Sequence, residues 1–223
     1  MNLKESSLQY LNKLQKNNNR DWFAKHKPSY IEAQDNIKGI FNVIRENLDK
    51  HDEIEKFKLF RIYRDVRFSK DKTPYKAHFS GSFSRLGKHL RGGYYLRIKP
   101  DESFLAGGFW EPNKEDLYRI RKEIEIDATE MRDLLNDKKF IKYFGDTLKG
   151  AELKTAPRGF DKDHPDIDLI RKKGFIAVRK FSDEEVLSNN FTQEVNNSYK
   201  ALRPFFDYMS DVLTTNLNGE SIL

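Results

Sequence analysis

The chain has 223 residues, of which 37% are hydrophobic and 13% aromatic, which is enough for a folded core and excludes global disorder. It contains no cysteine, so disulfides, thiolate metal sites and a cysteine nucleophile are excluded. The net charge of +6 is unevenly distributed: residues 61–99 hold eleven Lys or Arg and two Asp, while the remainder holds 30 basic and 33 acidic residues. This local excess predicts an anionic partner for that region.

The first residues and the hydropathy indicate a soluble, cytoplasmic protein. The sequence begins MNLKESSLQYL, with an early acid and no apolar run, so we expect no signal peptide. No stretch approaches the roughly 20 apolar residues of a membrane-spanning helix, so no membrane partner is expected. The length suits a single domain over residues 1–223.

Residues 6–50 are predicted to be helical. Leu11 and Leu14 belong to a run of leucines at helical spacing. Asn19 is suited to cap the short helix that follows, and Pro28 suits the first turn of the next helix.

Residues 58–110 form the predicted β core. Ile62, Val66 and Phe68 alternate with polar residues, which predicts a strand through the positively charged segment. The connections between the later apolar runs are short, which favours antiparallel pairing. These further strands are expected at residues 78–84, 94–99 and 103–110. Near the end of the last one, the pair Gly107–Gly108 predicts a tight bend or a close backbone approach.

The second half of the chain predicts helices, a short β region and helices again. Helices are expected over 113–144 with Asn113 as the first cap, and further strands within 150–181, around residues 153–156 and 174–181. Helices return over 183–216, where Ser182 and Glu185 form a capping box and Pro204 predicts a break or kink. This order predicts the α+β class, a mainly antiparallel sheet flanked by N-terminal, middle and C-terminal helices.

The stretch RDVRFSKDKTPYK, residues 64–76, is the strongest candidate for a site. On a strand, residues 61, 65 and 67 share one face, so Asp65 would lie between Arg61 and Arg67 and hold their guanidiniums outward. Arginine presents a planar fork of donors that matches phosphate and carboxylate. The pattern therefore predicts an anion-binding surface.

Four neighbouring residues would complete this surface. Arg64 falls on the apolar face and, if buried, needs an acidic partner such as Asp71. Lys72 and Lys76 would close on the same anion as mobile charges, with Tyr75 beside them. The alternative is an internal network of ion pairs, but Asp65 and Asp71 cannot neutralise all six cations of residues 61–76.

Two residues are candidates for catalysis. Asp71 would serve as an acid or base, or as a structural partner, and His78 lies among Lys and Arg residues that favour its neutral form. If the protein is an enzyme, phosphoryl or phosphodiester chemistry is the class that such electrostatic positioning supports. The sequence does not decide whether turnover occurs, and it requires no cofactor.

An acidic cluster and several aromatic residues offer other interpretations. The cluster consists of Asp161, Asp163, His164, Asp166 and Asp168, whose hard ligands suit Mg²⁺ or Mn²⁺, but the spacing fits no metal loop, so no metal is predicted.

Aromatic residues interleaved with Lys and Arg are also how single-stranded nucleic acid is bound. The relevant side chains are Trp22, Phe23, Tyr63, Tyr75, Tyr94, Tyr95 and Trp110. Core packing explains the alternation in residues 94–99 better than nucleic-acid binding does. The sequence contains no RNA-recognition block.

Three interpretations of function follow. The leading one is binding of a phosphorylated or other anionic small ligand at a basic sheet surface. The alternative is a non-catalytic module that binds nucleic acid or an acidic protein, for which affinity should fall steeply with salt. In the third, the cations complement acidic helices such as residues 122–130 and no ligand exists. The oligomeric state is left open by all three.

The positively charged segment also carries a family resemblance. RIYRDVRFSKDKTPYK, residues 61–76, resembles the R-x-x-RDxRFxxDKxPYK signature of a widespread family of bacterial and fungal proteins that is defined as a domain of unknown function. Other blocks of the family's sequence pattern are similar to residues 11–30, 92–98, 107–112 and 159–175. The resemblance therefore spans about residues 8–180. It implies a single α+β domain, and it implies no reaction and no catalytic residue.

Overall fold

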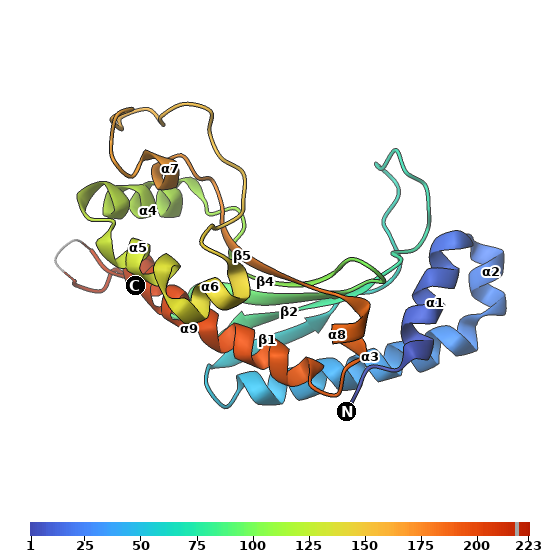
Figure 1. The fold of residues 1–223 in the computed structure, drawn as a ribbon. Coiled ribbons are helices and arrows are strands. Elements are labelled where there is room, and N and C mark those ends of the chain that lie inside the picture. Colours follow the sequence, from blue (N-terminus) through green and yellow to red (C-terminus); the bar gives the residue numbers. More distant parts are fainter. Residues whose placement is uncertain (217–218) are drawn as a thin grey trace. The chain divides into compact units, whose positions relative to one another are not determined.

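Helices and strands follow one another along the chain as the α+β class requires, so this prediction is confirmed (Figure 1). The computed structural model describes residues 1–216 and 219–223. The helices are α1 (Glu5–Lys16), α2 (Arg20–Lys25), α3 (Lys27–Leu48), α4 (Lys114–Ile126), α5 (Thr129–Asn136), α6 (Lys138–Phe144), α7 (Ile167–Ile170), α8 (Asp183–Leu187) and α9 (Phe191–Thr214). The strands are β1 (Ile54–Leu59), β2 (Phe79–Arg85), β3 (Gly93–Ile98), β4 (Ser103–Phe109) and β5 (Phe175–Phe181).

The strands pair in the order of the chain. Within the described residues they form one antiparallel sheet with the order β1-β2-β3-β4-β5. Short connections between β2, β3 and β4 favour this arrangement, as expected. Among the helices of the described part of the chain, none combines the length and the hydropathy that a membrane span needs.

Capping residues set several helix boundaries as predicted. The Asn19 side chain accepts a hydrogen bond from the Trp22 backbone N–H at 2.9 Å at the start of α2. Asn113 caps α4 in the same way, and Ser182 with Glu185 forms a capping box before α8. The break predicted at Pro204 is wrong, because α9 continues through this residue.

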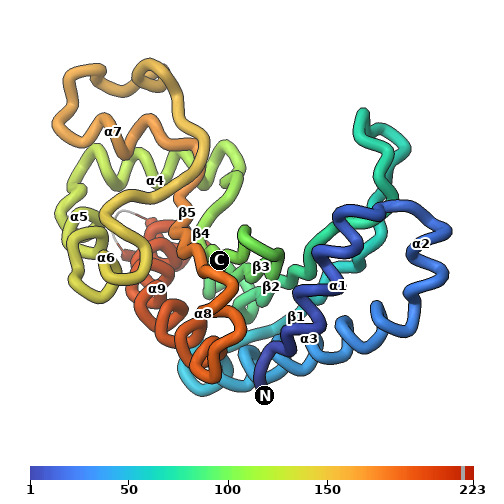
Figure 2. Tube along the Cα trace, turned by 45° about the vertical axis from the view of Figure 1, so that its right-hand side comes forward, coloured from blue at the N-terminus to red at the C-terminus, as the bar shows by residue number. Residues whose placement is uncertain are grey.

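The strand predicted through the positively charged segment is also wrong. β1 lies earlier than expected and ends at Leu59, and residues 60–78, here called the signature loop, connect it to β2. The two arms of this loop meet at a single antiparallel bridge between Tyr63 and Tyr75. The loop extends beyond the ends of β1 and β2 in both views (Figures 1 and 2).

Side chains of the signature loop compete for the backbone groups that a strand would need. The Asp65 carboxylate accepts a hydrogen bond from the Arg67 backbone N–H at 3.2 Å. The Asp71 carboxylate accepts one from the Thr73 backbone N–H at 2.9 Å. Aspartate turns of this kind offer the backbone an alternative to a β ladder, which explains the loop despite the alternating pattern.

The second β region is smaller than predicted. Residues 153–156 form no strand, and β5 is accompanied in this region by two isolated bridges, Lys149 with Ile176 and Glu152 with Lys172. The short helix α7 occupies part of the range expected to be β. The range 113–144 is helical as expected and contains α4, α5 and α6.

The chain divides into two compact units, each described here by itself. Unit 1 comprises Met1–Phe83, Tyr95–Leu105 and Lys180–Asn197. In it, α3 lies along α1 and β1 (Figure 1). The ring of Phe41 on α3 stacks on Phe57 and Phe83 of the sheet, with centroids 5.8 and 6.0 Å away. Phe41 and Phe83 are buried and Phe57 is half-buried, and the three rings contribute apolar packing to unit 1.

Unit 2 comprises Ser84–Tyr94, Ala106–Arg179 and Ser198–Leu223. The buried ring of Tyr94 lies 4.6 Å from that of Tyr199 and 5.0 Å from that of Phe206, between centroids. These contacts hold the C-terminal part of α9 against the unit's strand residues. The expectation that residues 1–223 form one domain stays a prediction.

The glycine pair in β4 marks a close approach of neighbouring groups. A Cβ at Gly107 would lie 2.2 Å from Leu202 Cδ2, and one at Gly108 would lie 2.1 Å from the Phe175 backbone oxygen. Gly108 also has a φ of +140°, which L side chains rarely adopt. The close approach predicted here is confirmed, whereas the bend is not, because both residues lie within β4.

Replacing Gly108 with alanine should destabilise the protein. The added Cβ meets a backbone oxygen that cannot rotate away, so we expect a loss of roughly 2 kcal/mol or more. Thermal unfolding of Gly108→Ala should then occur about 4 °C or more below that of the unmodified protein. Gly87→Ala is the control, because Gly87 has a φ of +67° but no atom within 4 Å of its Cβ position. Equal shifts for the two variants would contradict this account.

Candidate functional site

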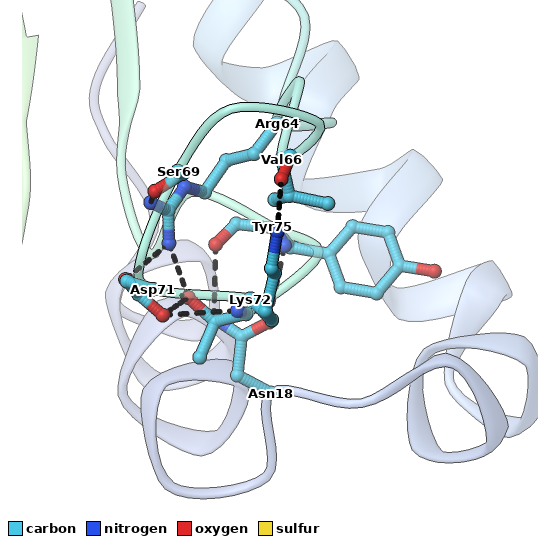
Figure 3. Close-up of polar contacts among 8 residues, drawn as sticks. Asn18, Arg64, Val66, Ser69, Asp71, Lys72 and Tyr75 are labelled. Atoms are coloured by element: carbon cyan, nitrogen blue, oxygen red, sulfur yellow. Dashed lines mark hydrogen bonds and ion pairs between the residues drawn. The ribbon is translucent and has the colours of Figure 1, made fainter.

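Arg64 closes the signature loop from within (Figure 3). Its side chain is only 25% exposed, and its guanidinium forms an ion pair with Asp71. The same guanidinium donates hydrogen bonds to the Thr73 hydroxyl and, at 3.4 Å, to the Ser69 hydroxyl. The acidic partner expected for a buried Arg64 is therefore Asp71. These contacts join residues on both arms of the loop and hold its conformation.

Hydrogen bonds stabilise the ionised form of Asp71. The backbone N–H of Thr73, the Arg64 guanidinium and the Thr73 hydroxyl lower the pKa of Asp71 to about 2. A carboxyl with this pKa carries no proton to donate near pH 7. Of the two roles expected for Asp71, acid or base and structural partner, its position supports the second.

Asp65 and Lys72 are also engaged within the loop. Asp65 accepts two hydrogen bonds from the Arg67 guanidinium, at 3.0 Å from Nε and 2.6 Å from Nη2, and these bonds lower the pKa of Asp65. Arg61 makes no such contact with Asp65, so the predicted symmetric pair of arginines is not formed. Lys72 Nζ donates to the backbone oxygen of Val66 at 3.0 Å (Figure 3).

Tyr75 anchors the loop to the N-terminal helices. Its backbone N–H donates to the Asn18 side-chain oxygen at 3.1 Å, and its backbone oxygen accepts from Asn18 Nδ2 at 2.9 Å (Figure 3). Its ring stacks on Phe23 with centroids 4.0 Å apart. The residue is 6% exposed, so the ring serves the core and not a ligand surface.

An open hollow lies between the loop and the turn that precedes α2. Its volume is about 770 Å³, and its lining includes Arg20, Asp21 and Lys72. Because charges of both signs line it, the hollow does not concentrate positive charge. The predicted convergence of the loop cations on one cavity is therefore not seen at this place.

A different surface of unit 1 gathers cations around aromatic rings. We call it the basic patch, and it consists of Lys58, Phe60, Arg61, Lys76, His78, Tyr95, Arg97, Lys99 and Phe104. The ring of Tyr95 lies between those of Phe60 and Phe104, at centroid distances of 6.4 and 5.6 Å. It is built from the end of β1, the base of the signature loop and strands β3 and β4.

Cationic groups lie over the outer rings of this row. Lys58 Nζ is 5.5 Å and Lys76 Nζ is 5.7 Å from the centroid of Phe60. Arg97 Cζ is 4.5 Å from the centroid of Phe104. Contacts of this kind hold a cation at a partly apolar surface without neutralising its charge.

The basic patch contains few carboxylates. Glu102 pairs with both Arg97, at 3.1 Å, and Lys99. The side chains of Lys58, Arg61 and Lys76 have no hydrogen-bonded or ion-paired partner among the residues that the structure describes. Arg97 and Lys99 thus share the carboxylate of Glu102, and Asp65 lies near enough to Arg61 for the guanidinium to contribute to lowering the pKa of Asp65.

Burial and neighbouring cations together lower the pKa values of Lys76 and His78. Burial, followed by Arg61, Arg64 and Lys58, lowers the pKa of Lys76. Burial together with the neighbouring cations, of which Arg97 acts most strongly, lowers the pKa of His78 to about 4. His78 is therefore neutral at pH 7. The pKa is lowered, as expected from the Lys and Arg residues around this histidine.

The acidic cluster of residues 161–168 is held in unit 2 by protein contacts. Arg132 pairs with Asp166, at 2.9 Å, and with Asp168. The His164 ring accepts a hydrogen bond from the Asp166 backbone N–H at 3.0 Å. Within residues 1–216 and 219–223, no group of three or more His, Cys, Asp or Glu side chains is arranged to hold a metal ion.

Part of the basic patch is not evident from the sequence. Lys58 and Phe60 lie outside the positively charged residues 61–99, and Arg97 fits the ordinary strand alternation of residues 94–99. A signal was present, since Tyr95, Arg97 and Lys99 alternate with the buried residues of β3. The sequence does not show that this face lies beside Lys76, because the long signature loop separates the two positions.

Asp71→Asn should loosen the signature loop without unfolding the protein. The amide cannot form the ion pair with Arg64, so we expect trypsin to cleave faster after Arg67, Lys70 or Lys72 while thermal unfolding changes little. Asp35→Asn, which alters an exposed carboxylate of α3, is the control. Because the folded pKa of Asp71 is below its unfolded value, the contact should persist above about pH 4 and be lost as the pH falls toward 2. Unchanged cleavage of Asp71→Asn would contradict the bracing role.

NMR titration of His78 should show a midpoint near pH 4. A folded pKa of about 4, below the ordinary value of 6.5, means that the unfolded chain binds this proton first. The contribution of His78 to stability should therefore decrease as the pH falls from about 6.5 to 4. Arg97→Gln should raise the midpoint by removing the strongest neighbouring cation, and an unchanged midpoint would count against the influence of the neighbouring cations.

The comparisons with known proteins give a family and no activity. Residues 6–208 match the family described as Conserved hypothetical protein (DUF2461). None of the curated proteins matches the chain, and none of the solved structures matches it. The matched range covers the signature loop, both units' sheet residues and most of α9. The chain therefore belongs to the DUF2461 family of conserved hypothetical proteins.

Proposed function

We propose that this protein binds a phosphorylated or other anionic small ligand at the basic patch. The observation that carries the proposal is the charge balance. Arg97 and Lys99 share the carboxylate of Glu102, while Lys58, Arg61 and Lys76 form no ion pair among the described residues, although Lys58 and Lys76 lie over the ring of Phe60. Like charges held close together repel one another, and an anion that enters between them relieves this repulsion. The site therefore favours a ligand with at least one phosphate or carboxylate group.

Arg61 and Lys76 provide the principal contacts in this proposal. Both were expected to bind the ligand, and neither has an acidic partner among the described residues. Lys58 and Arg97 extend the set from either side of the ring row. His78, neutral at pH 7, offers one nitrogen as donor or acceptor to a ligand oxygen.

The other expected ligand residues have a different part in the proposal. Arg64, Asp65, Arg67 and Lys72 already bind groups of the signature loop, and their contacts fix the loop that leads to Lys76. Tyr75 anchors the same loop through its backbone. In this proposal these residues position the signature loop, and the cations at the base of the loop contact the ligand.

A catalytic step on the bound phosphate stays a prediction. Asp71, with a pKa of about 2 and three hydrogen bonds, suits bracing better than proton transfer. A pKa of about 4 makes the His78 imidazole a weak base, which favours ligand recognition over proton abstraction. The proposed function is therefore binding. Phosphoryl chemistry would need a catalytic group other than Asp71 and His78.

Reversing charges in the basic patch should abolish anion binding. For the double variant Arg61→Glu/Lys76→Glu, we expect the affinity for pyrophosphate to fall at least tenfold in isothermal titration calorimetry at low salt. Lys38→Glu makes a charge change on the exposed side of α3 and should bind as the unmodified protein does.

Binding should also be visible at His78. A bound phosphate brings negative charge near the imidazole, so pyrophosphate should raise the pKa of His78 above about 4. A folded double variant that still binds pyrophosphate with the original affinity would overturn the proposed function.

A further inference from the structure

Phe68 is the most exposed of the large hydrophobic residues that the structure describes. It is 97% exposed, whereas Trp110, a large exposed ring in unit 2, reaches 67%. It lies in the turn at the tip of the signature loop, which extends away from the strands (Figures 1 and 2). An apolar ring placed so completely in water has no role in the packing of this chain.

The loop holds this ring on a braced support. Arg64 binds Asp71 and Thr73 across the loop, and Lys72 Nζ binds the backbone oxygens of Val66, at 3.0 Å, and Arg67, at 3.4 Å. These contacts fix the backbone on either side of Phe68. Because the backbone is already held, a partner that covers the ring has to order only the two side-chain torsions of Phe68, which favours binding.

Cations without an ion pair among the described residues lie at both the tip and the base of the loop. Lys70 lies two residues from Phe68, while Arg67 beside the ring is paired with Asp65. Arg61 and Lys76 lie at the base, where the Lys76 backbone N–H donates to the Ile62 backbone oxygen at 2.7 Å. Six residues separate Arg61 from Phe68, a span of at most about 20 Å, which is longer than a single phosphate group.

We propose that the anionic ligand of the basic patch is a segment of single-stranded nucleic acid, with one base stacked on Phe68 and the phosphates following the loop cations to the patch. This inference rests on the proposed function, because the patch supplies the cations at the base of the loop. Exposed rings and nearby cations are the two elements with which proteins hold single strands without reading their sequence.

The geometry favours a strand over an anionic membrane. A flat bilayer would meet the tip of the loop and leave Arg61 and Lys76 out of reach at its base. Phe68 is the only large apolar side chain strongly exposed on the described loop, since Tyr63 is 44% exposed and lies in the bridge to Tyr75. One inserted ring provides too little apolar area for stable membrane anchoring.

The inference predicts separate effects at the tip and at the base of the loop. Binding of fluorescein-labelled dT12 is measured by anisotropy, and binding of pyrophosphate by calorimetry. Phe68→Ala should weaken dT12 binding roughly tenfold and leave pyrophosphate binding unchanged, because stacking is lost and the patch is intact. Phe68→Trp should restore dT12 binding. Ile31→Ala removes a 47% exposed apolar side chain of α3 and should change neither affinity.

The outcomes distinguish this inference from the proposed function. If Phe68→Ala binds dT12 like the unmodified protein, or if the protein binds pyrophosphate and not dT12, the inference is overturned and the proposed function stands. If Arg61→Glu/Lys76→Glu retains both affinities, both proposals fail. Phe68-dependent binding to phosphatidylserine vesicles in place of dT12 would overturn the inference in favour of a membrane. Log-linear weakening of dT12 binding with salt, together with the Phe68 effect, supports it.

Discussion

The ion pair between Arg64 and Asp71 governs the conformation of the signature loop. The half-buried Arg64 guanidinium finds its acidic partner in the exposed Asp71 on the other arm of the loop. The hydrogen bonds from Thr73 and Arg64 lower the pKa of Asp71 to about 2, so the pair persists well below neutral pH. Because this contact closes the loop, its tip presents Phe68 and its base places Lys76 beside the sheet.

The cations of this region separate into two groups with different partners. Arg64, Arg67 and Lys72 bind carboxylates or backbone oxygens of the loop and are largely neutralised by it. Arg61 and Lys76 are not neutralised, and burial and mutual repulsion lower the pKa of Lys76. Such a repulsive arrangement costs stability, and relief of this repulsion is the basis of the proposed anion binding. This separation explains why the proposed contacts lie at the loop base.

Local chemistry made much of the fold predictable. Asn19, Asn113 and Ser182 begin helices because their side chains accept the first free N–H groups, and this requires only a few neighbouring residues. The strand predicted at residues 61–68 failed because two signals compete there. The alternating pattern favours a strand, but the short carboxylates bind the backbone N–H groups two residues later, and this local bonding prevails without a neighbouring strand.

The sequence by itself determined the α+β class, most helix boundaries and the place of the positive charge, since these follow from spacing and composition along the chain. It could not determine which cations would pair with carboxylates in the described part of the chain. That depends on contacts between distant positions, such as Asn18 with Tyr75, which fixes the loop against the helices. Phe60 and Tyr95 likewise meet only because the sheet forms. Tertiary structure decided the basic patch because a charge balance is a property of neighbours in space.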